Sequence, residues 1–265
     1  MGSPAEISWH KGEAASGTPA PAAKVVVVMP ARNAARTLEQ TVSAIPTDVV
    51  SEIILVDDKS TDETLEVARR LPLHLIWHPH NVGYGGNQKT CYLEALQRGA
   101  EVVVMLHPDG QYEPALIPRM VEPILRGEAD MVLGSRLSEP GVWKRSGMPR
   151  YKFVANRGLT LIENAILRTH FSELHTGYRA YSRELLLTVP FLRNSIDFVF
   201  DSEMVMQAVH FGFRIVEVPA RTRYFPEASS ASAAQSIIYG IKTLGAAAQL
   251  MLHRRGVVRS RKFVP

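Results

Sequence analysis

Apolar runs alternate with amphipathic segments in the first half of the chain. The apolar runs cover residues 24–30 (KVVVVMP), 52–56, 73–77, 102–106 and 131–134, and helical spacing covers 37–45 and 61–71. A glycine-rich turn at 80–86 leads into a third helical segment that ends near Arg98. Strands that alternate with helices are typical of a parallel sheet, so the pattern predicts an α/β fold.

The second half is less regular. The polar, Gly- and Pro-containing stretch 138–149 predicts a loop, and 150–167 predicts a helix. The runs 196–200 and 214–218 predict two strands that bracket a helix over 202–211. From Ile237 onward, apolar residues at helical spacing predict a C-terminal helix with a basic end; they are Ile237, Ile241, Leu244, Ala248 and Met251.

Polar segments follow three of the predicted strands. They are Ala31-Arg32-Asn33, the segment 57–62 that opens with Asp57-Asp58, and the segment 107–111 (HPDGQ). In open α/β sheets, ligands bind beyond the carboxyl ends of the strands. We therefore expect one site at this edge, and its carboxylates favour a metal-assisted phosphate ligand. The alternative for Asp57 and Asp58 is that they only cap the next helix.

The HPDGQ segment contains candidate metal ligands. In an extended chain, His107, Asp109 and Gln111 project to the same side. An imidazole, a carboxylate and an amide oxygen form a partial shell for Mg²⁺ or Mn²⁺, which phosphate oxygens and water complete. The alternative is a common Pro-Asp-Gly turn with incidental neighbours.

Composition narrows the class of protein. With 265 residues and 46% hydrophobic content, the chain can form one compact enzyme-sized domain. A single cysteine, Cys91, excludes an internal disulfide framework. Residues 1–23 are rich in Ala, Pro and Gly, which predicts a disordered lead-in. No apolar stretch is long enough to cross a bilayer, and we expect a cytoplasmic protein.

Positive charge accumulates in the second half. The formal net charge is +4 with a sequence pI near 9.2, and arginines concentrate after Gly134. This bias favours phosphate ligands of any kind. No nucleic-acid motif accompanies it, so we expect no nucleic-acid partner.

The ordered series of motifs resembles a known family. MPARN, VDDKSTDET, NVGYGGNQ, LHPDGQY, GSR, HTGYRAYSREL and EVPARTRY follow one another over residues 24–230. This series is similar to the inverting nucleotide-sugar glycosyltransferases related to dolichyl- and polyprenyl-phosphate sugar synthases. The resemblance implies a GT-A fold with a mixed, mostly parallel sheet flanked by helices. It also implies a nucleotide-binding first half and an acceptor-binding second half. Residues 231–265, after the region of resemblance, contain the predicted C-terminal amphipathic helix and basic tail.

The resemblance assigns the donor side of the site. It implies that Pro30, Ala31, Arg32 and Asn33 line the nucleotide pocket and that Asp57 and Asp58 lie near the base and ribose of a UDP- or GDP-sugar. The metal motif of the family reads Asp-x-Asp, followed two residues later by Gln in the lipid-phosphate enzymes. Here the corresponding residues are His107, Asp109 and Gln111, so an imidazole replaces the first carboxylate.

The resemblance also suggests residues near the reacting centre. Asp109 and Arg136 are expected to act there, and Arg221 and Arg223 are candidates to clamp the pyrophosphate. Asp201 and Glu203 lie where the family often places an acidic residue that faces the acceptor. Either a general base or a group that orients the arginines fits these two carboxylates.

These assignments predict metal-dependent, inverting transfer of a sugar to a polyprenyl-phosphate-type lipid. The alternatives are transfer to a hydroxyl acceptor in cell-envelope polysaccharide or glycolipid synthesis, and a catalytically inactive nucleotide-binding scaffold. The C-terminal helix has three possible positions: in the interface of a membrane that the protein contacts peripherally, on the protein's own core, or on a second subunit of a homo-oligomer.

Overall fold

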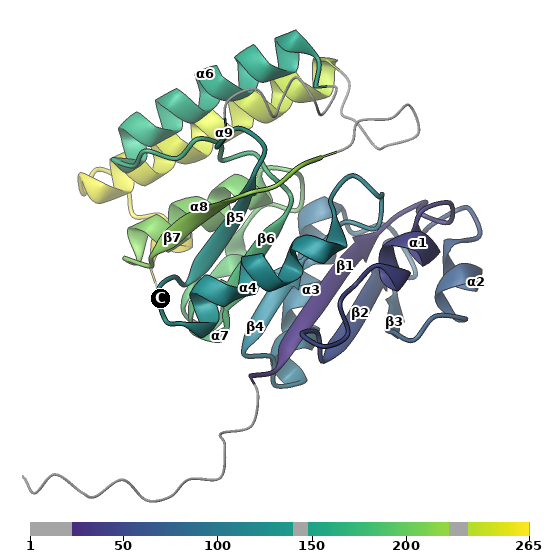
Figure 1. The fold of residues 1–265 in the computed structure, drawn as a ribbon. Coiled ribbons are helices and arrows are strands. Elements are labelled where there is room, and N and C mark those ends of the chain that lie inside the picture. The colour runs from purple at the N-terminus through teal and green to yellow at the C-terminus, as the bar shows by residue number, and fades with distance from the viewer. Residues whose placement is uncertain (1–22, 140–147, 223–232, 265) are drawn as a thin grey trace, which may run out of the picture.

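The sheet consists of seven strands in the order β3-β2-β1-β4-β6-β5-β7. The structure is a computed structural model, and it describes residues 23–139, 148–222 and 233–264 (Figure 1). The expected lead-in therefore lies almost entirely outside the described residues. The strands are β1 (Val25–Ala31), β2 (Glu52–Asp57), β3 (His74–Trp77), β4 (Val102–Met105), β5 (Met131–Ser135), β6 (Arg179–Ser182) and β7 (Ile215–Pro219).

Most neighbouring strands run parallel. β1 pairs in parallel with β2 and β4, β2 with β3, and β5 with β7. β6 is antiparallel to both of its neighbours, β4 and β5. The expectation of a mixed, mostly parallel sheet is thus confirmed.

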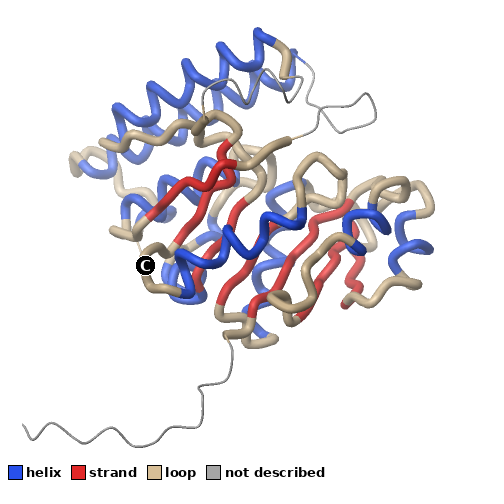
Figure 2. The backbone as a smooth tube through the Cα atoms, viewed as in Figure 1, coloured by secondary structure: helices blue, strands red, loops and turns tan. Residues whose placement is uncertain are grey.

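Helices cover both faces of the sheet (Figure 2). The longer helices are α3 (Tyr84–Gln97), α4 (Ile117–Leu125), α6 (Arg150–Leu167), α8 (Phe200–His210) and α9 (Ala233–Arg254), and the shorter ones are α1 (Leu38–Ser43), α2 (Thr64–Ala68) and α7 (Arg183–Thr188). Alternate residues of the central strands enter opposite cores: Val26 and Val28 pack with α3 and α8, whereas Val27 and Met29 pack with α1 and α4.

One sequence-based prediction in the second half is wrong, and one strand was not predicted. Residues 196–199 form a loop rather than the start of a strand, and Phe200 begins α8. The side chains of Ile196 and Phe198 are exposed, so the alternating pattern does not mark a buried strand face. β6 was not predicted, and it carries the fully buried Arg179.

Helices α6 and α9 lie side by side at one end of the molecule (Figure 1). α9 starts earlier than predicted and contributes Ala246, Ala247 and Leu250 to the core. The predicted apolar stripe is not its buried face, because Ile237 and Ile241 are exposed. Core packing thus accounts for the C-terminal half of α9 and leaves an apolar surface at its start. In the described part of the chain, no helix has the length and apolar character needed to span a bilayer.

Candidate active site

Three loops meet at the carboxyl ends of β1, β2 and β4 (Figure 1). The chain passes from β1 to β2 on one side and later returns to β4 on the other. The space between β1 and β4 is therefore a topological switch point, where ligands bind in open α/β sheets.

Hydrogen bonds join the first loop to its neighbours. Asn33 has a left-handed backbone conformation with φ 53°. Its side-chain Oδ1 accepts from the backbone amide of Thr61 at 2.8 Å, and its backbone amide donates to Ser60 Oγ at 2.8 Å. Thr37 Oγ1 donates to the carbonyl of Pro108 at 2.5 Å. Pro30 and Ala31 are buried at the end of β1, whereas Arg32 and Asn33 are exposed. These bonds make the three loops one connected edge.

Asp57 and Asp58 are both buried and engaged by the protein. Asp57 accepts from the amide of Ser60 at 3.0 Å and from its hydroxyl. Asp58 accepts from the amide of Val82 at 2.7 Å and from the side-chain amide of Asn81 at 2.8 Å. Asp58 thereby fixes the segment that leads into α3, which places Tyr84 at the start of that helix.

The segment 107–111 is a turn. Asp109 Oδ1 accepts from the backbone amide of Gln111 at 3.0 Å, and Gly110 has a φ of 72°. Of the two alternatives for this segment, the structure shows the Pro-Asp-Gly turn and not the extended chain, and glycine permits the left-handed backbone that closes the turn. His107, Asp109 and Gln111 are half-buried at the site edge.

Tyr84 links His107 to Asp201 across the site. Its hydroxyl donates to Asp201 Oδ2 at 2.7 Å and lies 3.1 Å from His107 Nε2. Gln88 Nε2 donates to the other carboxylate oxygen of Asp201 at 3.1 Å. Burial, followed by the charge of Asp201, raises the pKa of Tyr84 well above its ordinary value.

A buried arginine lies behind Asp201. Arg179 Nη1 donates to the backbone carbonyl of Asp201, and its Nε donates to the carbonyl of Thr176 at 2.7 Å. Burial opposes the charge of this guanidinium, but the Asp201 carboxylate and the neighbouring tyrosine hydroxyls together outweigh burial, and the pKa of Arg179 lies above its ordinary value. This charge compensates the buried carboxylate.

Glu203 lies on the same helix but has different partners. Its carboxylate accepts from the amide and the hydroxyl of Ser195, at 2.6 and 2.9 Å, and from Lys262 Nζ. Both carboxylate oxygens thus hold the 194–199 loop and the C-terminal segment, whereas the carboxylate of Asp201 is linked to His107.

Arg136, at the end of β5, is paired with Glu173. The carboxylate of Glu173 accepts from Arg136 Nε at 2.8 Å and from the Arg136 backbone amide at 2.7 Å. Burial favours the neutral carboxyl, but Arg136 outweighs burial and lowers the pKa of Glu173.

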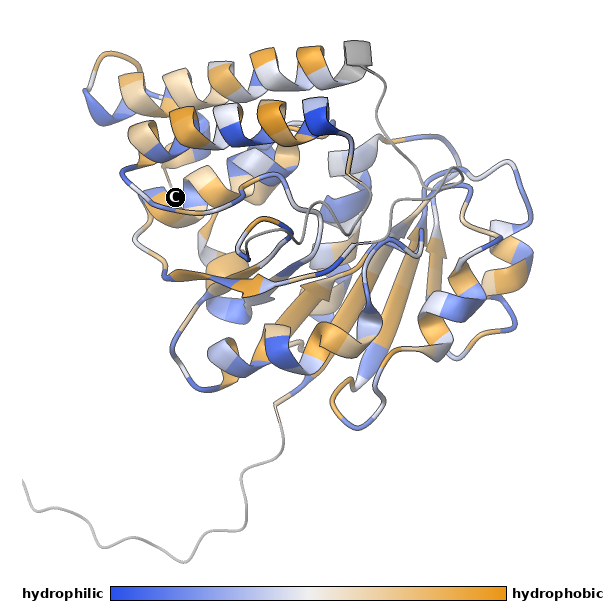
Figure 3. Cartoon of the chain, turned by 45° about the horizontal axis from the view of Figure 1, so that its top comes forward, coloured by the Kyte–Doolittle hydropathy of each residue, from blue (hydrophilic) through white to orange (hydrophobic). Residues whose placement is uncertain are grey.

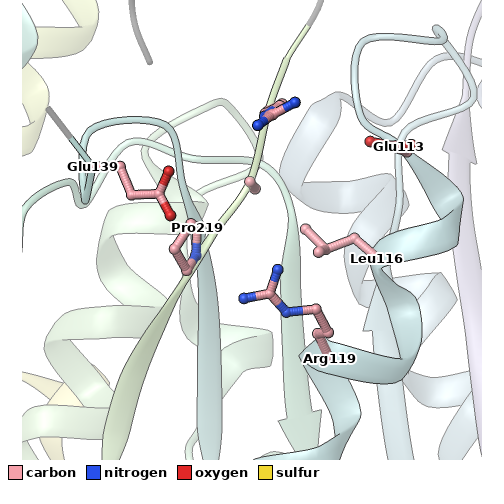
Figure 4. Close-up of a pocket in the computed structure, with 7 residues that line it drawn as sticks. Glu113, Leu116, Arg119, Glu139 and Pro219 are labelled. Carbon is pink, nitrogen blue, oxygen red and sulfur yellow. The ribbon is translucent and has the colours of Figure 1, made fainter. Parts of the chain in front are cut away.

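Arg221 borders a pocket of about 210 Å³. The pocket lies between the start of α4 and the end of β7, and the guanidinium of Arg119 points toward Pro219 (Figure 4). Glu113 and Glu139 also line it. Arg223, which was predicted to clamp the pyrophosphate together with Arg221, lies outside the described residues.

The donor atoms fit a divalent cation that shares its shell with a ligand. Among the residues that the structure describes, no three His, Cys, Asp or Glu side chains gather into a metal cluster. His107 and Asp109, with the amide oxygen of Gln111, would supply only part of a shell of about six ligands. Phosphate oxygens and water are the natural remainder, as expected for a cation that binds together with a nucleoside diphosphate.

Sequence reasoning missed Tyr84, Glu173 and Arg179. Tyr84 and Arg179 lie within segments that carried the family resemblance, NVGYGGNQ and HTGYRAYSREL, whereas Glu173 lies just before the second of these segments. Their partners are distant in sequence, at separations of 117 residues for Tyr84–Asp201 and 37 for Arg136–Glu173. Only the folded chain shows these pairs.

Comparison with known proteins agrees with this fold. The chain is 27% identical to a UDP-N-acetylglucosamine–dolichyl-phosphate N-acetylglucosaminyltransferase of Methanococcus voltae, over 76% of this chain and 86% of the relative. It is 28% identical to an undecaprenyl-phosphate mannosyltransferase of Micrococcus luteus, over 74% and 82%. Glucosyl-3-phosphoglycerate synthase from Mycobacterium tuberculosis, solved with Mn²⁺, UDP and glucosyl-3-phosphoglycerate, superposes with a TM-score of 0.64 at 20% identity, covering 90% and 82%.

These likenesses define the class of protein. The sheet and its helices form a GT-A fold, as the motifs predicted. The family model for glycosyl transferase family 2 matches residues 26–189, and the chain belongs to that family. It is a glycosyltransferase whose homologues include dolichyl- and polyprenyl-phosphate enzymes.

Proposed function

We propose that this protein transfers a sugar, with inversion, from a nucleotide-diphosphate sugar to a polyprenyl-phosphate-type lipid. The observation that carries the proposal is the similarity to two lipid-phosphate transferases over more than four-fifths of each relative. Such coverage includes the acceptor-binding half as well as the nucleotide-binding half.

The nucleotide end of the donor is assigned to the loops after β1 and β2. Pro30, Ala31, Arg32 and Asn33 border this position, and their backbone is held by the segment 57–62. Asp57 and Asp58 act here by shaping the pocket walls, since their carboxylates accept several internal hydrogen bonds. A UDP- or GDP-sugar is the expected donor.

The diphosphate end is assigned to the turn after β4. His107, Asp109 and Gln111 would hold Mg²⁺ or Mn²⁺, which supplies positive charge opposite the leaving diphosphate. Arg221 and Arg223 add guanidinium groups, whose planar forks suit phosphate oxygens. Mn²⁺ and UDP occur together in the solved Mycobacterium tuberculosis synthase, which supports this arrangement.

The acceptor end is assigned to Arg136 and Asp201. A phosphate acceptor is already anionic near neutral pH, because its second pKa is about 6, so no general base is required. In this reaction Asp201 orders Tyr84 and Gln88 instead of removing a proton. A hydroxyl acceptor is the alternative, and it would require a positioned base such as Asp201.

An apolar surface at the end of the molecule that bears the site offers a place for the lipid. It consists of Tyr151, Val154 and Leu161 on α6 and Ile237, Ile238 and Ile241 on α9, each more than half exposed. The two helices lie side by side at the top of Figure 3. Exposed basic residues flank this surface, among them Arg150, Arg168 and Arg254. Apolar side chains with a basic rim complement an anionic bilayer surface, and we assign this surface to peripheral membrane contact.

The test compares two acceptors that differ only in the phosphate. UDP- and GDP-sugars are incubated with undecaprenyl phosphate or undecaprenol, with and without Mn²⁺, and the lipid product is identified by mass spectrometry. We expect sugar transfer only to the phosphate, with an anomeric configuration opposite to that of the donor by NMR. Transfer to undecaprenol alone would establish the hydroxyl alternative, and a retained configuration would contradict inversion.

A further inference from the structure

Hydrogen-bond polarity determines which nitrogen of His107 carries a proton. The phenol of Tyr84 lies between Asp201 Oδ2, at 2.7 Å, and His107 Nε2, at 3.1 Å. A phenol has one proton to donate, and a carboxylate has none. The Tyr84 proton is therefore donated to Asp201. The hydrogen bond between the Tyr84 hydroxyl and His107 then forms only if His107 Nε2 carries a proton and donates it to the Tyr84 oxygen.

The far side of the network fixes this direction. Tyr92 Oη donates to Gln88 Oε1 at 2.6 Å, which orients the amide so that Gln88 Nε2 donates to Asp201 Oδ1 at 3.1 Å. Gln88 and Tyr92 are completely buried. Each donor in the chain from Tyr92 to Asp201 thus has one acceptor.

Packing around the imidazole leads to the same result. A Cβ atom added at Gly177 would lie 2.9 Å from both Cδ2 and Nε2 of His107, so the backbone of Gly177 closes this edge of the ring. The ring of Tyr84 stacks on the imidazole with centroids 5.6 Å apart. Between Gly177 and the Tyr84 hydroxyl, the Nε2 edge has no room for a cation.

We propose that Tyr84 is a positioning residue that holds His107 in its Nε2–H form, so that Nδ1 is the nitrogen offered to the divalent cation. This inference rests on the proposed function for the cation itself. A histidine ligand is commonly oriented by the acceptor of its second ring N–H. In this chain that acceptor is a tyrosine, itself fixed by Asp201.

The first measurement needs neither metal nor substrate. Two-bond ¹H–¹⁵N NMR correlations distinguish the two tautomers of a histidine. They are recorded on the uniformly labelled, metal-free full chain at a pH of about 8, where an ordinary histidine is neutral. The chain has 9 histidines, so the His107 signal is identified by its loss in His107→Gln. We expect the Nε2–H pattern in the wild type and a mixture of tautomers in Tyr84→Phe. An Nδ1–H pattern in the wild type would overturn the proposal.

The second measurement is Mn²⁺ affinity in the presence of UDP, by titration calorimetry. Loss of a group that orients a metal ligand typically weakens metal binding by about 10- to 100-fold, and we expect a loss in this range for Tyr84→Phe. Tyr178→Phe is the matched control: it also removes a buried hydroxyl, one that donates to the Glu113 carbonyl, and its affinity and tautomer should match the wild type. Thermal unfolding verifies that each variant is folded.

The two measurements separate the inference from the function beneath it. Equal Mn²⁺ affinity in Tyr84→Phe and the wild type would refute the positioning role. A wild-type protein that binds no Mn²⁺ with UDP would refute the proposed metal site, whereas the NMR comparison would still decide whether Tyr84 sets the tautomer.

Discussion

The Nε of Arg136 donates to Oε1 of Glu173 at 2.8 Å, in an ion pair with side-chain exposures of only 11% and 0%. Asn156 of α6 donates to the same carboxylate at 2.7 Å, and Arg136 Nη2 donates to the His175 carbonyl at 2.8 Å. Glu173 thus ties the end of β5 to α6. The orientation of Arg136, which we assign to the acceptor end, depends on a carboxylate that the family motifs did not identify.

Replacement of Glu173 is expected to be strongly destabilising. Glu173→Ala leaves Arg136 as a buried charge without its carboxylate, and breaking such a pair typically costs about 3–5 kcal/mol. Urea unfolding followed by circular dichroism measures the free energy. The control is Glu122→Ala, which removes an exposed partner of Arg126 and should cost less than about 1 kcal/mol. A similar loss of unfolding free energy in Glu173→Ala and Glu122→Ala would show that burial of the Arg136–Glu173 pair adds nothing to its contribution to stability.

The same pair predicts a loss of stability in acid. The pKa of Glu173 in the folded protein lies below its ordinary value of 4.5, so the folded state favours the ionised form. Its contribution is fully present above the unfolded-state pKa and disappears as the pH falls through the lower folded-state pKa. We expect the difference in unfolding free energy between the wild type and Glu173→Gln to shrink below pH 4.5. If the unfolding free energies of the two proteins instead change in parallel with pH, Glu173 makes no such pH-dependent contribution to stability.

The sequence predicts the regular elements with local signals well. The apolar runs identified β1 to β5, and α6 has the predicted bounds, Arg150–Leu167. Turns and helix starts with glycine or proline were also recognisable. These elements depend on short-range periodicity, which is visible in one chain.

The failures in the second half have tertiary causes. β6 includes Arg179, whose burial becomes possible only when the carbonyls of Leu174, Thr176 and Asp201 accept from its guanidinium. The run 196–200 alternates like a strand, yet the Ile196 carbonyl accepts from the Gly85 amide at 2.9 Å and serves to dock α3. For the candidate site, the predicted strand ends were enough to locate the acidic loops. The hydrogen bonds of Tyr84 to His107 and Asp201 were visible only in the folded chain.

Two substitutions test the proposed metal ligands. Asp109→Ala removes the only carboxylate of the HPDGQ segment, and we expect UDP affinity in the presence of Mn²⁺ to fall at least about 10-fold. His107→Asp exchanges an imidazole for a carboxylate, which suits Mg²⁺ better, and should raise turnover with Mg²⁺ relative to Mn²⁺. Titration calorimetry and product assays measure the two effects. Unchanged UDP affinity in Asp109→Ala would remove this segment from the metal site.

The apolar surface of α6 and α9 gives the last prediction, which needs point substitutions because truncation of α9 would remove Ala247 and Leu250 from the core. We expect the wild type to co-sediment with anionic liposomes, and Leu161→Asp and Ile241→Asp to lose most of this binding, since each places a charge on the apolar surface. High salt should weaken wild-type binding, because each nearby Lys or Arg adds about 1 kcal/mol of attraction. Leu187→Asp is the control, since Leu187 is 62% exposed on α7, against 60% for Leu161, and its binding should not change.

If the surface instead joins two copies, the wild type will sediment as a dimer in the ultracentrifuge, the two surface variants will be monomers, and no protein will follow the liposomes. That result would reject the membrane assignment and favour a homo-oligomer.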